Sequence, residues 1–175
     1  MLAKEIDVGL RPHPLAGQPE ASPDAEASLA DEILSRARAR AAKNNLAYAG
    51  EVTPQEAWTL FSSGAAVIVD VRTAEELHFV GQVPDAPHVA WATGSAMTKN
   101  PRFLRELETK VAKDVPVLLL CRSAKRSHSA AEAAAKGGFR HAFNILEGFE
   151  GDLDEHGQRG HTGGWRYQGL PWTQL

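Results

Sequence analysis

The 175-residue sequence contains a single cysteine, Cys121, so no disulfide can form within the chain. This excludes a small secreted domain held together by disulfides and favours a reducing compartment. The sequence also lacks an apolar run of about 18 residues, which a membrane-spanning helix needs. Its first residues lack the apolar stretch of about 7–15 residues that is typical of a secretory signal. We therefore expect a cytoplasmic protein without a membrane partner.

A strong charge of either sign is absent as well. The net charge is −3 and the sequence pI is about 6.2. Domains that bind nucleic acids are usually strongly basic, so we expect no nucleic-acid partner. Hydrophobic residues make up 43% and charged residues 23%, which is typical of a globular protein. The length suits one domain with roughly 25–50 further residues.

The N-terminal region differs in composition from the rest of the chain. Four of the ten prolines lie within the first 23 residues. Because proline fixes φ and lacks a backbone donor, we expect no regular element over residues 11–25 and a flexible tail over residues 1–24. Residues 25–44 are rich in strong helix formers and predict a surface helix within an N-terminal extension, residues 25–50. Residues 51–175 are predicted to form the main domain.

Short apolar runs alternate with helix signals through this main domain. The runs predict buried strands at residues 65–71, 116–120 and 142–145, with a further short strand at 88–90. Capping patterns and helical spacing predict helices at 56–61, 73–79, from about 100, and at 127–136. Such alternation indicates an α/β fold with a central, mainly parallel sheet flanked by helices.

The segment that carries reactive chemistry begins at Cys121, directly after the strand at 116–120. Ser127 starts the next helix, so the loop between them is expected at the carboxyl edge of the sheet, where α/β folds bind ligands. Backbone N–H groups and the positive end of the helix favour a thiolate and an anionic ligand. Cationic side chains strengthen this field. The sequence therefore predicts a nucleophile, Cys121, and an anion pocket formed by Arg122, Ser123, Ala124, Lys125, Arg126 and Ser127.

The alternative is an inert, buried cysteine, because free cysteine is among the most buried residue types. Three cations lie within five residues of Cys121. They would be costly to bury without partners, which favours the reactive interpretation.

Several segments together resemble a rhodanese domain. They are VIVDVR (67–72), GQVPDAPHVAW (81–91), LLLCRSAKRS (118–127) and GFRHAFNILEGFEGD (138–152), followed by the C-terminal GGWRYQGLPW (163–172). The resemblance extends from about residue 53 to residue 172. It implies a rhodanese-like sulfurtransferase whose cysteine takes the outer sulfur of thiosulfate as a persulfide and releases sulfite. A thiophilic acceptor then removes that sulfur.

The resemblance also implies roles for individual residues. Cys121 would carry the persulfide, and residues 122–127 would bind the donor. Asp70 and Arg72 match an Asp-x-Arg pattern of the family and are interpreted as a structural brace, an ion pair or hydrogen bond near the end of the sheet. The implied partners are a small anionic sulfur donor and a cyanide-like or thiol acceptor, a protein thiol included. No cofactor and no metal ion is implied.

One position departs from the family pattern, which often reads Cys-Arg-x-Gly. Ala124 takes the glycine position here. If that position requires a positive φ, alanine strains the loop. The sequence leaves open whether Trp91, Trp165 and Trp172 belong to the core or line the pocket.

Two other functions are compatible with parts of this pattern. A cysteine phosphatase or arsenate reductase needs an arginine six positions after the cysteine, where Ser127 stands, and Arg126 comes one position early. A non-catalytic module that carries sulfur or binds a protein would keep the fold without the reaction, since fold does not fix function. Cys121 and the basic loop argue against an inactive module.

Overall fold

The computed structural model describes residues 22–174, so the predicted flexible tail lies outside the described residues apart from its last three positions. The elements, in chain order, are α1 (Pro23–Asn44), β1 (Gly50–Val52), α2 (Pro54–Ser62), β2 (Val67–Asp70), α3 (Ala74–Val80), β3 (Ala92–Thr93), β4 (Thr98–Lys99), α4 (Phe103–Glu108), β5 (Val117–Leu120), α5 (Lys125–Lys136) and β6 (Ala142–Ile145).

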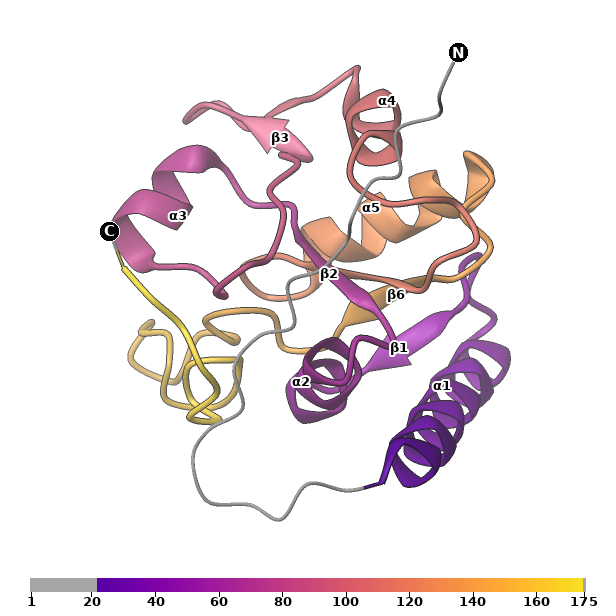
Figure 1. Cartoon of the computed structure of the whole chain (residues 1–175). Helices are drawn as coiled ribbons and strands as arrows, with labels where there is room; N and C mark the ends of the chain where they lie inside the picture. Colours follow the sequence, from indigo (N-terminus) through magenta and orange to yellow (C-terminus); the bar gives the residue numbers. More distant parts are fainter. Residues whose placement is uncertain (1–21, 175) are drawn as a thin grey trace.

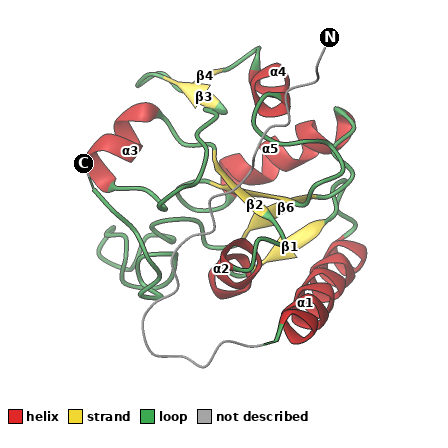
Figure 2. Cartoon of the chain, viewed as in Figure 1, coloured by secondary structure: helices red, strands yellow, loops and turns green. Residues whose placement is uncertain are grey.

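Four strands form the central sheet in the order β1-β6-β5-β2, and every neighbouring pair is parallel. Strands β3 and β4 form a separate antiparallel hairpin. In Figure 1, α1 and α2 lie below the sheet and α4 and α5 above it, while Figure 2 shows the same layers coloured by type of element. The predicted α/β class, with a mainly parallel sheet flanked by helices, is confirmed.

The two faces of the sheet contribute to separate apolar clusters. On β5, Leu118 and Leu120 pack with residues of α1 and α2. Val117, Leu119 and Cys121 pack with residues of α4 and α5. This is the alternation expected of a strand buried on both faces, and it directs Cys121 toward the α5 side.

The prediction that residues 11–25 contain no regular element is wrong at its C-terminal end. Helix α1 begins at Pro23, and the Ser22 side chain accepts a hydrogen bond from the Ala25 N–H. Proline suits the first helical position because the N–H that it lacks would have no partner within the helix there. The pattern that was interpreted as a tail therefore also contains a helix start.

Strand β1 was not predicted, because three residues are too few to show a periodicity. It forms the edge of the sheet beside β6, with Glu51 opposite Asn144. A Cβ atom on Gly50 would collide with the Ala37 backbone oxygen, so a glycine lets α1 lie close against this edge. The buried side chains of α1 join the core on this face: Ala30, Ile33, Leu34 and Ala37.

Two other predictions differ from the structure. Residues 88–90 form no strand, because only an isolated bridge links His88 to Asp70. The hairpin of β3 and β4 was missed. Helix α5 begins at Lys125, two residues earlier than predicted, so Lys125 and Arg126 belong to its first turn.

Within residues 22–174, no helix has the length and apolar character needed to cross a membrane.

Candidate active site

Cys121 lies where β5 ends and the chain turns toward α5, beside a cavity of about 310 Å³. The cysteine itself is 1% exposed. One wall of the cavity comes from the loop and the first turn of α5, and the other from the β3–β4 hairpin. The lining residues besides Cys121 are Arg122, Ser123, Lys125 and Arg126 on the first wall and Trp91, Ala92, Met97 and Lys99 on the second.

The hairpin wall combines an aromatic ring with a cation. Trp91 packs edge-to-face on Phe103 of α4, with ring centroids 5.0 Å apart, which anchors the indole. Lys99 Nζ lies 4.6 Å from the centre of the Trp91 ring. The sequence had left the place of Trp91 open, and in the structure it lines the pocket, whereas Trp165 is fully buried.

Sequence reasoning missed Ala92, Met97 and Lys99. The available signal was Gly94, a turn residue between the short segments at 92–93 and 98–99, which is typical of a hairpin. Two-residue strands are too short to make that signal decisive.

Ala124 has the positive φ that would strain the loop. Its φ is 65°, in the left-handed region, and it precedes α5 without a side-chain cap. A residue with a Cβ atom pays about 1–2 kcal/mol in this conformation, and glycine does not. Neighbouring interactions must therefore hold the loop in place.

Those interactions come from the segment after β6. The Phe149 N–H donates to the Cys121 carbonyl oxygen at 2.8 Å, and the Glu150 N–H donates to the Arg122 carbonyl oxygen at 3.0 Å. Gly148, with φ of 69°, passes so close to the loop backbone that a side chain would not fit. This support fixes the start of the loop from the side of β6.

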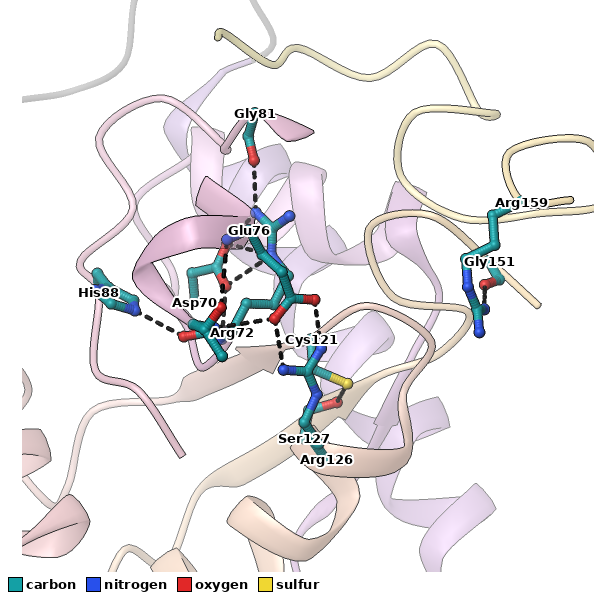
Figure 3. Close-up of polar contacts among 11 residues, drawn as sticks. Asp70, Arg72, Glu76, Gly81, His88, Cys121, Arg126, Ser127, Gly151 and Arg159 are labelled. Atoms are coloured by element: carbon teal, nitrogen blue, oxygen red, sulfur yellow. Dashed lines mark hydrogen bonds and ion pairs between the residues drawn. The ribbon is translucent and has the colours of Figure 1, made fainter. Parts of the chain in front are cut away.

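The cations around Cys121 are not equivalent. Arg126 forms two hydrogen bonds with Glu76 of α3, at 2.7 and 2.6 Å, and both side chains are mostly buried (Figure 3). The Arg122 Nε atom is buried without a hydrogen-bond partner among the described residues. Lys125 is exposed at the start of α5. The charge of Arg126 is therefore already balanced in part, whereas Arg122 and Lys125 can attract an anion.

Glu76 has a lowered pKa for a related reason. Burial opposes its ionisation, but the hydrogen bond from Arg126, the backbone N–H of Thr73 and the positive charge of Arg126 outweigh that penalty. Glu76 also completes the capping box of α3 with Thr73. One carboxylate thus joins the start of α3 to the start of α5.

Asp70 and Arg72 form a fully buried ion pair at the end of β2. Arg72 Nη2 lies 2.6 Å from Asp70 Oδ2 and donates to the Gly81 carbonyl oxygen at 2.8 Å. The guanidinium carbon lies 4.0 Å from the centre of the Phe149 ring. The pair therefore connects β2, the end of α3 and the segment that supports the loop, as Figure 3 shows in part. This geometry supports the structural role, which stays a prediction.

Ser127, on the first turn of α5, is fully buried and directed at the cysteine. Its Oγ lies 3.2 Å from Cys121 Sγ and 2.7 Å from Asn144 Oδ1. Ser123 lines the cavity, while Ala124 does not. The structure thus gathers most of the predicted loop residues around Cys121, with Ser127 beneath the cavity rather than in its wall.

A second cavity, of about 300 Å³, lies in the C-terminal segment, and no cysteine lines it. Its lining residues are Glu150, Arg159, Gly160, His161, Arg166, Tyr167 and Trp172. The cavity at Cys121 is the one that combines a thiol with cations, and it is the candidate active site.

Comparison with known proteins identifies similar chains. The family model of the rhodanese-like domain matches residues 53–155. The uncharacterized protein RP600 of Rickettsia prowazekii is 34% identical over 117 residues, covering 65% of this chain and 87% of that protein. A Coxiella burnetii protein named thiosulfate sulfurtransferase GlpE is 30% identical over 100 residues, covering 57% of this chain and 83% of that protein.

A solved structure is similar over most of the chain. The crystal structure of Rv0390 from M. tuberculosis gives a TM-score of 0.66 at 48% sequence identity. The match covers 73% of this chain and 99% of that chain. Helix α1 and strand β1 precede the part that the family model matches.

Replacing Ala124 with glycine is expected to stabilise the protein by up to about 1 kcal/mol. Glycine removes the cost of the left-handed φ, and its greater freedom in the unfolded chain offsets part of that gain. Urea unfolding measures the difference. The control is Ala133→Gly within α5, which should destabilise by about 1 kcal/mol. A loss of stability in Ala124→Gly would contradict the strained conformation.

Replacing Glu76 with glutamine is expected to destabilise the protein by about 1–3 kcal/mol at pH 7, because a charge-assisted bond to Arg126 is weakened. Since the pKa of Glu76 is lowered in the folded state, its contribution is complete above the ordinary glutamate pKa of about 4.3. This contribution to stability declines as the pH falls below the ordinary pKa and is gone once the pH has passed through the lower pKa of the folded state. Between these two values the unfolded state binds the proton more readily than the folded state does.

Urea unfolding of the wild type and Glu76→Gln between pH 7 and pH 3 tests this dependence. The two proteins should become more alike in stability toward pH 3. Glu32→Gln is the control, since Glu32 pairs with Arg36 on the exposed face of α1 and should matter by less than about 0.5 kcal/mol. A difference that persists unchanged at pH 3 would refute the electrostatic origin.

Proposed function

Because the chain belongs to the rhodanese-like domain family and has the α/β fold that its sequence resemblance predicted, we propose that it is a sulfurtransferase. Cys121 takes a sulfane sulfur from thiosulfate or a similar anionic donor and passes it to a thiophilic acceptor. The observation that carries the proposal is the position of Cys121 at a cavity edged by Arg122, Lys125 and Lys99. The name of the Coxiella burnetii relative supports the same reaction class.

In the first step, the Cys121 thiolate attacks the outer sulfur of thiosulfate. A sulfur–sulfur bond forms at Cys121, and the original sulfur–sulfur bond breaks, so that sulfite leaves with the electron pair. Cations beside the cavity stabilise both the approaching dianion and the leaving one. Cys121 then bears a persulfide.

In the second step, cyanide or a thiolate acceptor attacks the outer sulfur of that persulfide. The new bond forms to the acceptor, and the Cys121 thiolate leaves with the electron pair. The product is thiocyanate or an acceptor persulfide, and the enzyme returns to its first state. A protein thiol is among the acceptors of this proposal, and a reducing, cytoplasmic setting suits a cycle that needs a free thiol.

The phosphatase alternative is weaker on the geometry. Ser127 stands where that chemistry needs an arginine, and its side chain is buried against Cys121 and Asn144. Arg126 is engaged by Glu76. The alternative of a non-catalytic sulfur-carrying or protein-binding module keeps the same fold, and the experiment below separates it from the enzyme.

Incubation with thiosulfate is expected to add one sulfur atom to the wild-type protein, which intact mass spectrometry detects. Cys121→Ser should gain none, because Cys121 is the only thiol and a hydroxyl cannot hold a sulfane sulfur. Subsequent cyanide should remove the added sulfur and give thiocyanate. A folded wild type that neither gains sulfur nor forms thiocyanate with cyanide would favour the non-catalytic module.

The variants Lys125→Met and Lys99→Met each remove one positive charge from the cavity. Each is expected to lower kcat/KM for thiosulfate about tenfold. Opposite charges a few ångströms apart near a surface interact by about 1–4 kcal/mol, and about 1.4 kcal/mol corresponds to a factor of ten. The loss should shrink at high salt, which screens exposed charges. Steady-state rates at low and high ionic strength measure it.

Lys136→Met is the matched control, because Lys136 lies on the same helix at its far end, about 16 Å from Lys125 at 1.5 Å per residue. It should leave kcat/KM nearly unchanged. Arg126 is paired with Glu76, so Lys125 and Lys99 give the cleaner test of anion attraction. Wild-type values of kcat/KM for thiosulfate in both variants would contradict the role of these two charges in attracting the donor.

A further inference from the structure

A buried row of polar side chains leads away from Cys121 along the α5 side of the sheet. Ser127 Oγ lies 3.2 Å from Cys121 Sγ and 2.7 Å from Asn144 Oδ1. Asn144 Nδ2 in turn lies 3.5 Å from Glu51 Oε1 on the neighbouring strand. Ser127 and Asn144 are 0% and 2% exposed, so these bonds are shielded from water. No step of the proposed sulfur transfer uses Asn144 or Glu51.

The row continues to the surface through Tyr48 and His128. The Tyr48 hydroxyl donates to Glu51 Oε1 at 3.1 Å and lies 2.7 Å from His128 Nδ1. Burial, reinforced by the negative charge of Glu51, raises the pKa of Tyr48, so the hydroxyl keeps its proton. His128 is half-exposed and ends the row beside Glu132.

Part of this row lies outside the segment that the family model matches. Tyr48 and Glu51 precede residue 53, where that match begins. Glu51 stands opposite Asn144 in the register of β1 and β6. The segment before residue 53 therefore contributes a group, Glu51, that is linked to the reactive cysteine through Asn144 and Ser127.

The row has a defined direction because its members differ in what they can donate. An ionised Glu51 carboxylate only accepts, so it turns the Asn144 amide group toward itself and leaves Asn144 Oδ1 facing Ser127. Three acceptors lie within reach of the Ser127 hydroxyl: Asn144 Oδ1 at 2.7 Å, and Cys121 Sγ and the Ala124 carbonyl oxygen, each at 3.2 Å. Its single proton goes to Asn144 Oδ1, the nearest of them. Ser127 Oγ therefore presents lone pairs to Cys121. In this arrangement the Ser127 oxygen can accept a hydrogen bond from a Cys121 thiol, but it has no proton to donate to a thiolate.

We propose that Asn144 and Glu51 are positioning residues for Cys121: they hold the Ser127 hydroxyl away from the sulfur and so favour the thiol at rest. Reversing the Asn144 amide would release the Ser127 proton to the sulfur and favour the thiolate. The inference rests on the proposed function only in taking Cys121 as the nucleophile.

Glu51→Gln provides the reversal. Glu51 Oε1 accepts from both Asn144 and Tyr48, so the reversal takes place when the glutamine Nε2 stands at that position. It then donates to Asn144 Oδ1, while the Tyr48 hydroxyl donates to His128 Nδ1 instead. The Asn144 amide turns and donates to Ser127 Oγ, so that the Ser127 hydroxyl donates to the sulfur. The pH at which Cys121 reacts half-maximally with iodoacetamide should fall by about half to one pH unit, equivalent to about 0.7–1.4 kcal/mol for one hydrogen bond to an anion. Because Cys121 is the only thiol, the alkylation rate reports on it alone.

Other charged groups also face Cys121 and must be separated from this effect. They are Arg122 and Lys125 in the loop and α5, Arg126 with Glu76 of α3, Asp70 and Arg72 of β2, and Lys99 of β4. None of them changes in Glu51→Gln, but the loss of one negative charge itself favours a thiolate. The Ser127→Ala background isolates that part, since it lacks the hydroxyl.

The test is therefore a double-mutant cycle of Glu51→Gln and Ser127→Ala, with circular dichroism to confirm folding. Glu51→Gln should move the alkylation midpoint clearly more in the Ser127 background than in the Ser127→Ala background. Glu132→Gln, which also removes one carboxylate near His128 but contacts neither Asn144 nor Ser127, should move it by no more than about 0.3 pH unit, as a screened exposed charge. Equal shifts in both backgrounds would overturn the proposal.

Asn144→Leu gives a second test without any change of charge. It removes the nearest acceptor of Ser127 and leaves the hydroxyl proton to be shared between Cys121 Sγ and the Ala124 carbonyl oxygen, both at 3.2 Å, so the midpoint should fall in this variant too. An unchanged or higher midpoint in a folded variant would overturn the proposal. Alkylation needs no sulfur donor. A failure of this inference is thus distinguishable from a failure of the sulfurtransferase proposal, which the gain of sulfur by the wild type tests.

Discussion

The parallel pairing of β5 between β2 and β6 is the constraint on which the candidate site depends. Because all four strands of the sheet run the same way, β5 delivers its last residue to the middle of the carboxyl edge. Alternation along the strand then turns Cys121 toward α5. The segment after β6 reaches the same edge and fixes the loop through the Phe149 and Glu150 N–H groups.

Charge at this edge is divided between structure and ligand attraction. Two arginines are held by carboxylates: Arg72 by Asp70 and Arg126 by Glu76. A buried cation without such a partner would be costly, whereas a paired one ties elements together. The cations at the cavity that remain available to an anion come from the loop, the start of α5 and the hairpin. In the described part of the chain, this division leaves unpaired cations at the cavity, where an anion can bind, while Arg72 and Arg126 have carboxylate partners.

The region before residue 53 is more than an appendage in this structure. Helix α1 covers one face beside β1, where Gly50 permits close contact with Ala37. Strand β1 places Glu51 beside Asn144, and the preceding turn places Tyr48 beside His128. The proposed positioning of Cys121 therefore depends on residues that precede the part matched by the family model.

The sequence alone determined the α/β class, the strands β2, β5 and β6, and the loop that begins at Cys121. These follow from local patterns, since apolar runs, caps and cations near one cysteine reflect interactions between near neighbours along the chain. The comparison with Cys-Arg-x-Gly also pointed to Ala124 as a position of backbone strain, and its φ is 65°. Strand β1 and the hairpin were not predicted, because segments of two or three residues carry no periodicity.

Only the tertiary structure decided which side chains act together at the site. Arg126 meets Glu76 from 50 positions away, and Asn144 meets Glu51 from 93 positions away. Such pairs depend on the path of the whole chain, and no local pattern records them. The sequence pointed to Cys121 and the cations of its loop, while the folded chain paired Arg126 with Glu76, left Arg122 and Lys125 at the cavity and added Lys99 from the hairpin.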